Sequence, residues 1–168
     1  MSKSNIILIG MPGAGKSTVG VILAKRLGYG FVDTDLLIQT RVGKNLQAII
    51  NEDGLDAFRR IEEEVLLALE VQHTVIATGG SAVYSPAAMK SLKQSGTTVF
   101  INSPLQTLQA RIADMSTRGM VITPGESFAS LFIERNPLYR KYADLIVDEQ
   151  DKTVEQMADE IAKHFSQG

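Results

Sequence analysis

The sequence predicts an α/β fold in which a five-stranded parallel sheet is flanked by helices. Short apolar runs alternate along the chain with longer helical patterns, which is typical of parallel strands joined by crossover helices. The apolar runs are continuous and do not alternate with polar residues, as expected for strands covered on both faces. We expect strands at 6–9, 30–32, 74–77, 97–101 and 145–147, and helices at 17–27, 35–42, 46–52, 57–71, 86–94, 104–112, 127–142 and 153–165.

The first expected strand runs directly into a complete phosphate-binding loop. Gly10, Gly13 and Gly15 allow backbone angles at which successive N–H groups can face a polyphosphate. Lys16 adds a positive charge, and the first turn of the following helix points its unpaired N–H groups at the same place. Ser17 offers a hydroxyl to a magnesium ion. A plain glycine-rich turn would not explain why every position of the pattern is filled, so we expect a nucleoside triphosphate site.

The second expected strand ends in a pair of carboxylates, Asp33 and Asp35, at the sheet edge where open parallel sheets place their ligands. One interpretation is structural: Asp35 caps the next helix, with Thr34 as a further candidate. The other is functional: the two carboxylates hold a magnesium ion or a substrate hydroxyl, and one orients or deprotonates an attacking alcohol. More helical segments follow than a plain crossover needs, so we expect the excursion at about 34–62 to form a pocket wall.

The helix expected at 57–71 opens with arginines. Arg59 and Glu62 lie three residues apart and so share one helical face. An ordinary surface pair is one interpretation. The other is a guanidinium that is held by a glutamate and aimed at a substrate carboxylate, which it can bind in a bidentate manner. The core positions of this helix are expected at Ile61, Val65, Leu66 and Leu69.

Two further segments carry candidate binding residues. The pair Gly79 and Gly80 follows the third expected strand, where it allows the backbone to approach a ligand or simply forms a tight turn. Residues 114–125 are rich in turn formers and lack a helical or strand period, so we expect a mobile loop that closes over the reacting phosphates. Three arginines lie in or beside this loop and could supply charge to a transferring phosphoryl group: Arg111, Arg118 and Arg135.

Length and composition limit the remaining possibilities. A chain of 168 residues with 44% hydrophobic content suits one domain with one core. The net charge of −2 and the dispersed Lys and Arg residues argue against a nucleic-acid surface. The absence of cysteine excludes disulfides and fits a reducing compartment. The first apolar stretch is too short to span a membrane and leads into the phosphate loop, so we expect a cytoplasmic protein.

Motifs along nearly the whole chain resemble one known family, that of shikimate kinase. The resemblance implies a three-layer P-loop kinase fold, a substrate-binding excursion and a lid. It also implies that ATP, with Mg²⁺, phosphorylates the 3-hydroxyl of shikimate on the route to aromatic amino acids. We expect a monomer. The motifs that carry the resemblance are GMPGAGKST at 10–18, FVDTD at 31–35, FRRIE at 58–62, TGG at 78–80, Arg118, and RNPLY at 135–139.

The resemblance also implies roles at the nucleotide end of the site. Arg111 would stack on adenine, and Arg118 would reach the phosphates from a lid at about 113–126. Ser17 and Asp33 would form the magnesium site. The residues expected to bind ATP are Gly13, Ala14, Gly15, Lys16, Ser17, Thr18, Arg111 and Arg118.

At the acceptor end, the resemblance implies that Arg59 and Arg135 bind the shikimate carboxylate, helped by the backbone at Gly79 and Gly80. Asp35 would hold the attacking hydroxyl. The residues expected to be catalytic are Lys16, Asp35 and Arg118.

The chain departs from the family pattern at several positions. Ser81 replaces a third glycine, Leu55 replaces a common glutamate, and Gly119-Met120-Val121 replaces Pro-Leu-Leu in the lid. Ser81 would restrict backbone approach to the acceptor or add a hydroxyl to the pocket, and Gly119 would loosen the lid. Another small hydroxylated acid therefore stays open as the acceptor. A nucleotide-binding regulator that transfers no phosphate is the alternative from a different class.

Overall fold

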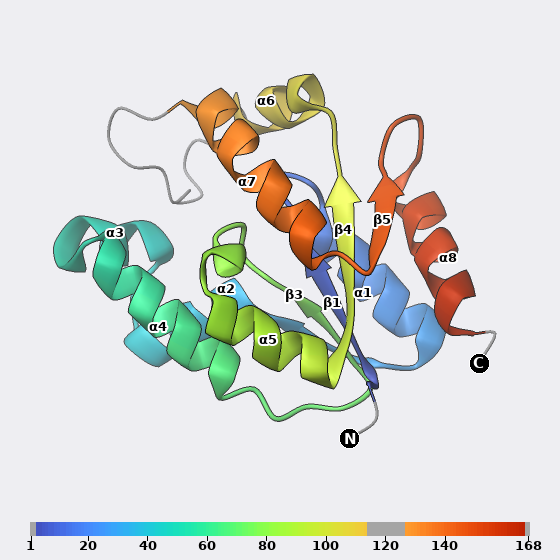
Figure 1. The fold of residues 1–168 in the computed structure, drawn as a ribbon, viewed down its shortest axis with the longest axis horizontal. Coiled ribbons are helices and arrows are strands. Elements are labelled where there is room, and N and C mark those ends of the chain that lie inside the picture. Colours follow the sequence, from blue (N-terminus) through green and yellow to red (C-terminus); the bar gives the residue numbers. More distant parts are fainter. Residues whose placement is uncertain (1–2, 114–126, 167–168) are drawn as a thin grey trace.

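A five-stranded, entirely parallel sheet forms the centre of the molecule (Figure 1). The structure, a computed structural model, describes residues 3–113 and 127–166. The strand order is β2-β3-β1-β4-β5, and both β1 and β3 are buried along their full length. The predicted fold class is therefore confirmed. The strands are β1 (Asn5–Ile9), β2 (Gly30–Asp33), β3 (Thr74–Ala77), β4 (Gly96–Asn102) and β5 (Leu145–Asp148).

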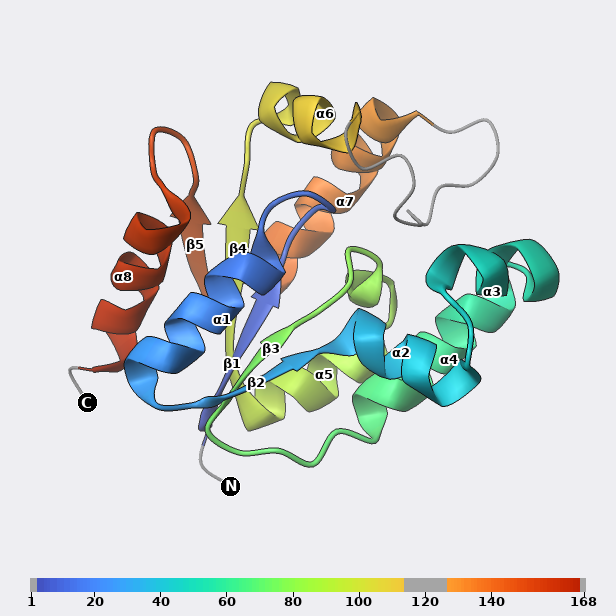
Figure 2. The same ribbon diagram turned by 180° about the vertical axis from the view of Figure 1, so that it is seen from behind.

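Helices cover both faces of the sheet and give the predicted three layers. Helices α1 and α8 lie on one face, whereas α5 and α7 lie on the other (Figures 1 and 2). None of the helices in these described ranges is long and apolar enough to cross a membrane. The helices are α1 (Lys16–Leu27), α2 (Thr34–Val42), α3 (Leu46–Asp53), α4 (Leu55–Leu67), α5 (Pro86–Ser95), α6 (Leu105–Ala113), α7 (Phe128–Tyr142) and α8 (Val154–Phe165), with a short 3₁₀ helix η1 (Ala82–Tyr84) that the sequence pattern does not predict.

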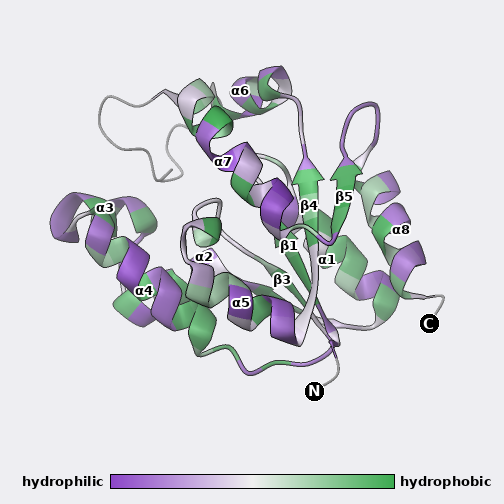
Figure 3. Cartoon of the chain, viewed as in Figure 1, coloured by the Kyte–Doolittle hydropathy of each residue, from purple (hydrophilic) through white to green (hydrophobic). Residues whose placement is uncertain are grey.

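The excursion between β2 and β3 forms helices α2, α3 and α4, which extend beyond the β2 edge of the sheet (Figure 2). These helices share a small hydrophobic cluster of their own, separate from the main core around the sheet. In Figure 3, β4 and β5 have hydrophobic colours, whereas α3 and α4 have mixed colours, as expected of helices with one exposed face. The excursion thus has a small hydrophobic core of its own. The buried residues of the small cluster are Ile38, Leu46, Ile49, Phe58 and Val65.

The start of α2 and the core positions of α4 bear on two predictions from the sequence. The N-cap of α2 is Asp33, whose side chain accepts hydrogen bonds from the backbone of Asp35 and Leu36. The structural interpretation, in which Asp35 or Thr34 caps this helix, is therefore wrong, because the cap is Asp33, whose backbone is extended as a cap requires. On α4, Val65 and Leu66 are buried as expected, and Ile61 packs partly buried against the small cluster. Leu69, expected on the same helix, lies beyond its end at Leu67 and packs partly buried against the main core.

Candidate active site

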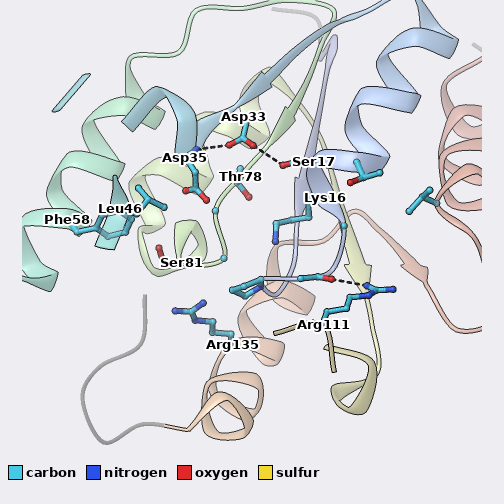
Figure 4. A pocket seen from close by; sticks show the side chains of 17 residues that line it. Lys16, Ser17, Asp33, Asp35, Leu46, Phe58, Thr78, Ser81, Arg111 and Arg135 are labelled. Atoms are coloured by element: carbon cyan, nitrogen blue, oxygen red, sulfur yellow. Dashed lines mark hydrogen bonds between the residues drawn. The ribbon is translucent and has the colours of Figure 1, made fainter. Parts of the chain in front are cut away.

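A cavity of about 560 Å³ opens at the carboxyl ends of the central strands (Figure 4). The phosphate loop, the start of α2, the loop at residues 78–81 and helix α7 all contribute to its wall. Among residues that the sequence analysis did not single out, Pro12, Leu46, Phe58, Thr78 and Val154 also line it. The predicted residues that line the cavity are Gly13, Gly15, Lys16, Ser17, Thr18, Asp33, Asp35, Gly79, Gly80, Arg111 and Arg135.

Three predicted residues are not part of that lining. Ala14, within the phosphate loop, is buried. Arg59 lies behind the wall, against Tyr84. Arg118, with the rest of the expected lid from 114 onward, lies outside the described residues.

The phosphate loop has the strained geometry that its glycines permit. Gly10 adopts a φ of +152°, and a Cβ there would lie 2.8 Å from the carbonyl oxygen of Ile101. The Lys16 ammonium is buried, and its Nζ donates to the carbonyl oxygens of Gly10 at 2.6 Å and Met11 at 2.8 Å. Burial lowers the pKa of Lys16 to about 8. Two carbonyl oxygens already pair with this ammonium, and a phosphate bound in the loop would meet its positive charge.

Ser17 and Asp33 form an oxygen-rich corner of the cavity. The Ser17 hydroxyl donates to Oδ2 of Asp33 at 2.8 Å, while Oδ1 of Asp33 accepts the α2 backbone N–H groups. The aspartate therefore uses one oxygen for the helix and turns the other toward the phosphate loop. A hydroxyl and a carboxylate are the donors that Mg²⁺ prefers, and this ion usually keeps several waters and takes one or two protein ligands. The pair fits a hydrated magnesium ion bound to a nucleotide.

Two carboxyl groups meet beside Gly79. A Cβ on Gly79 would clash with Oδ1 of Asp35 and lie 3.2 Å from Oε2 of Glu62, so a larger residue would have to displace the Asp35 side chain. Burial, and then the charge of Asp33, raise the pKa of Asp35 to about 6. Burial raises the pKa of Glu62 to about 7. Asp35 is thus mostly ionised at neutral pH yet more basic than a solvated aspartate, which suits a group that accepts a proton from an alcohol.

Glu62 belongs to the interior of the wall. Its side chain is 3% exposed and accepts a hydrogen bond from the Ser81 hydroxyl at 2.7 Å. The interpretation of Arg59 and Glu62 as an ordinary surface pair is therefore wrong. Ser81 lines the cavity as well, but its hydroxyl donates to the Glu62 carboxylate in the wall.

Arg59 and Arg135 converge on Tyr84. The Cζ of Arg59 lies 4.5 Å from the centre of the Tyr84 ring, and the Cζ of Arg135 lies 5.3 Å from it. Nε of Arg135 also donates to the Tyr84 hydroxyl at 3.2 Å. Arg135 is 2% exposed. The fold thus brings together two arginines that lie far apart in the sequence, of which Arg135 lines the cavity and Arg59 does not.

Arg111 joins α6 to the phosphate loop. Its Nη1 donates to the carbonyl oxygen of Gly13 at 2.8 Å, and its Nη2 pairs with Glu149. Glu149 is buried and also accepts a hydrogen bond from Ser103. Nothing in the sequence around Glu149 signalled this partner, because Glu149 follows β5 at the far end of the chain from the phosphate loop.

Comparison with known proteins identifies the kind of protein that has this site. The sequence model of a family described as shikimate kinase matches residues 12–166. The shikimate kinase of Paracidovorax citrulli is 39% identical over 164 residues, which cover 94% of this chain and 90% of that protein. The shikimate kinase of a Synechococcus species is 41% identical over 165 residues, which cover 96% of this chain and 82% of that protein.

Solved structures agree with the sequence relatives. Shikimate kinase from Acinetobacter baumannii in complex with shikimate superposes with a TM-score of 0.90 at 30% identity, covering 99% of this chain and 94% of that one. Shikimate kinase from Aquifex aeolicus gives a TM-score of 0.83 at 36% identity, covering 96% of each chain. The likeness thus extends over the whole fold, including the elements that build the cavity.

Proposed function

Because this chain belongs to the shikimate kinase family, we propose that it transfers the γ-phosphoryl group of ATP to the 3-hydroxyl of shikimate. This is the ATP-dependent kinase step of the shikimate pathway. One observation carries the proposal: a phosphate loop, a basic carboxylate at Asp35 and a buried arginine at Arg135 line the same cavity. These groups match the three chemical demands of the reaction, which are a bound polyphosphate, an activated hydroxyl and a carboxylate on the acceptor.

The nucleotide end of the cavity would hold ATP as follows. The backbone N–H groups of the phosphate loop bind the phosphates, and Lys16 leaves its carbonyl partners to contact the transferring group. Arg111 lies at the edge of the cavity and would contact the adenine. Ser17 and Asp33 would hold Mg²⁺, which supplies positive charge to the phosphate oxygens when bound. Arg118 would contribute a further cation from the lid.

The acceptor end would hold shikimate by its carboxylate. Arg59 and Arg135 provide two guanidinium groups for it, and Gly79 and Gly80 let the backbone come close. Nε of Arg59 is buried and, among the described residues, has no hydrogen-bond partner. Arg59 does not itself line the cavity, so its side chain would have to turn toward a bound carboxylate, which would then pair this costly unpaired donor.

Asp35 would act on the attacking hydroxyl. Its carboxylate lies at the cavity wall beside Gly79, two residues after Asp33. The hydroxyl proton moves to the Asp35 carboxylate as the hydroxyl oxygen forms its bond to the γ-phosphorus. The bond from that phosphorus to the β,γ-bridging oxygen breaks, and ADP leaves with the electron pair.

The test is a coupled ADP-release assay with Mg-ATP, run with and without shikimate and followed by mass detection of the product. We expect ADP release that depends on shikimate and a product heavier by one phosphoryl group. ATP binding without shikimate-dependent release would contradict the proposal and favour another hydroxylated acid as acceptor. We also propose that the protein works as a cytoplasmic monomer without nucleic acid or membrane, which sizing by light scattering checks for the oligomeric state.

A further inference from the structure

Tyr84 occupies a position that the catalytic chemistry does not explain. It ends the 3₁₀ helix η1, directly after the 78–81 loop, and its ring is half-buried. Its ring lies against Arg59 from α4 and Arg135 from α7. Tyr84 itself is not among the residues that line the cavity. Of its two arginine partners, Arg135 lines the cavity and Arg59 does not, so any effect of Tyr84 on the acceptor must pass through Arg135 or through a movement of the Arg59 side chain.

Tyr84 contacts both guanidinium groups. Each arginine has its Cζ within 6 Å of the ring centre, which is the range of a cation–π interaction. The hydroxyl adds a directional contact, because it accepts from Nε of Arg135 at 3.2 Å. Arg135 is further set against the 78–81 loop, since a Cβ on Gly80 would lie 2.9 Å from its Nη1.

These contacts have a physical consequence for binding. Arginine side chains have many rotamers, and ordering them when a ligand binds reduces affinity. Two like charges side by side also repel each other, and the negative face of an aromatic ring offsets part of that repulsion. A tyrosine that holds both groups in advance removes these costs from the binding step.

We propose that Tyr84 is a positioning residue for the acceptor, which holds Arg59 and Arg135 in place for the substrate carboxylate. This inference rests on the proposed function. It assigns specificity for a carboxylate to a residue in η1, an element that follows the glycine pair and lies behind the cavity wall.

The test compares two substitutions of Tyr84. Tyr84→Leu keeps an apolar side chain but removes the ring face and the hydroxyl, so we expect the KM for shikimate to rise about tenfold. The KM for ATP and kcat should stay within about twofold, because the arginines bind the carboxylate equally in ground and transition states. Tyr84→Phe keeps the ring, so its effect on the KM for shikimate should be only about threefold.

The controls separate positioning from folding. Tyr29→Leu removes another half-buried tyrosine, whose ring packs on His73 before the start of β2, and should leave both KM values unchanged. In an Arg59→Met background, Tyr84→Leu should raise the KM for shikimate by a smaller factor than in wild type, since one of its two targets is gone. Thermal melts verify that all variants are folded.

The outcomes distinguish this inference from the proposed function. A wild type that neither binds nor phosphorylates shikimate overturns both. An active wild type whose Tyr84→Leu variant keeps its KM for shikimate overturns the positioning role alone. Equal rises in the KM for shikimate and for ATP would also overturn it, because they indicate general damage to the site.

Discussion

The Ser81 hydroxyl donates a 2.7 Å hydrogen bond to Oε1 of Glu62, joining the loop after β3 to helix α4. The bond is buried and lies in the wall behind the acceptor end of the cavity. The sequence analysis expected glycine at this position of the family pattern, and a glycine could not make this hydrogen bond between the loop and α4. The carboxylate it contacts is one whose burial is otherwise costly.

Removing this link should lower stability. In Ser81→Ala, Oε1 of Glu62 loses its donor inside the protein, so we expect the free energy of unfolding to fall by about 1–3 kcal/mol. Urea titration measures the change. Ser95→Ala is a matched control, because the half-buried Ser95 hydroxyl donates to a carbonyl of its own helix at the end of α5. Equal losses in the two variants would argue against a special role for the Ser81 bond.

Glu62 should make stability depend on pH. Burial raises its pKa from 4.5 to about 7 in the folded chain, so the folded state holds this proton more tightly than the unfolded state. Its contribution to the free energy of unfolding is therefore complete below pH 4.5 and is lost as the pH rises through about 7. Asp35 acts in the same direction, because burial raises its pKa as well.

Urea titrations between pH 4.5 and 8 test this prediction. Glu62→Gln should flatten the decline of stability with rising pH, since the amide does not titrate in this range. Glu70→Gln, at an exposed position before β3, should leave the decline as it is in wild type. A Glu62→Gln variant with an unchanged slope would show that the carboxyl is not the source.

Lys16 should be essential for turnover. Lys16→Ala removes the buried ammonium beside the phosphate loop, so we expect kcat to fall by at least about 100-fold. Steady-state assays with saturating Mg-ATP and shikimate measure it. Lys25→Ala changes an exposed lysine on the same helix and should behave as wild type. Near-normal turnover in Lys16→Ala would remove this residue from the catalytic set.

Arg59 should matter for the acceptor more than for ATP. Arg59→Lys keeps the charge, but an ammonium cannot bind a carboxylate through two parallel hydrogen bonds, so we expect the KM for shikimate to rise about tenfold or more. The KM for ATP is measured in parallel and should change little. Arg60→Lys alters the exposed neighbour and serves as the control. Similar effects on both substrates would speak against the carboxylate role.

Asp35 should act in the chemical step. Asp35→Asn cannot accept the hydroxyl proton, so we expect kcat to fall by about 100-fold or more while ATP binding, followed by calorimetry, is largely kept. Asp56→Asn changes an exposed aspartate in the first turn of α4 and is the matched control. If ATP affinity collapsed together with kcat, Asp35 would be serving the magnesium ion instead of the acceptor.

Residues whose role depends on their neighbours along the chain could be predicted from local pattern. The phosphate loop is one continuous segment, and its glycines, lysine and serine take their geometry from the adjoining strand and helix. The alternation of apolar runs and helical patterns likewise predicted the order of strands and helices, because strands buried on both faces, such as β1 and β3, are continuous apolar runs.

Residues whose role depends on distant segments could not be predicted in this way. Sequence spacing paired Glu62 with Arg59, and the charge of Arg59 does act on Glu62. The spacing gave no sign that Ser81 donates to Glu62 or that Tyr84 lies against Arg59. Glu149 reaches Arg111 only because β5 lies beside β4 in the sheet.

Local sequence pattern was enough to predict the fold class, the phosphate loop and the candidate charged residues around it. Which of those charged side chains are buried, and which neighbours contact them, depends on the tertiary structure. Burial and contact depend on how separate helices and loops pack at one edge of the sheet, and local sequence carries no record of that packing.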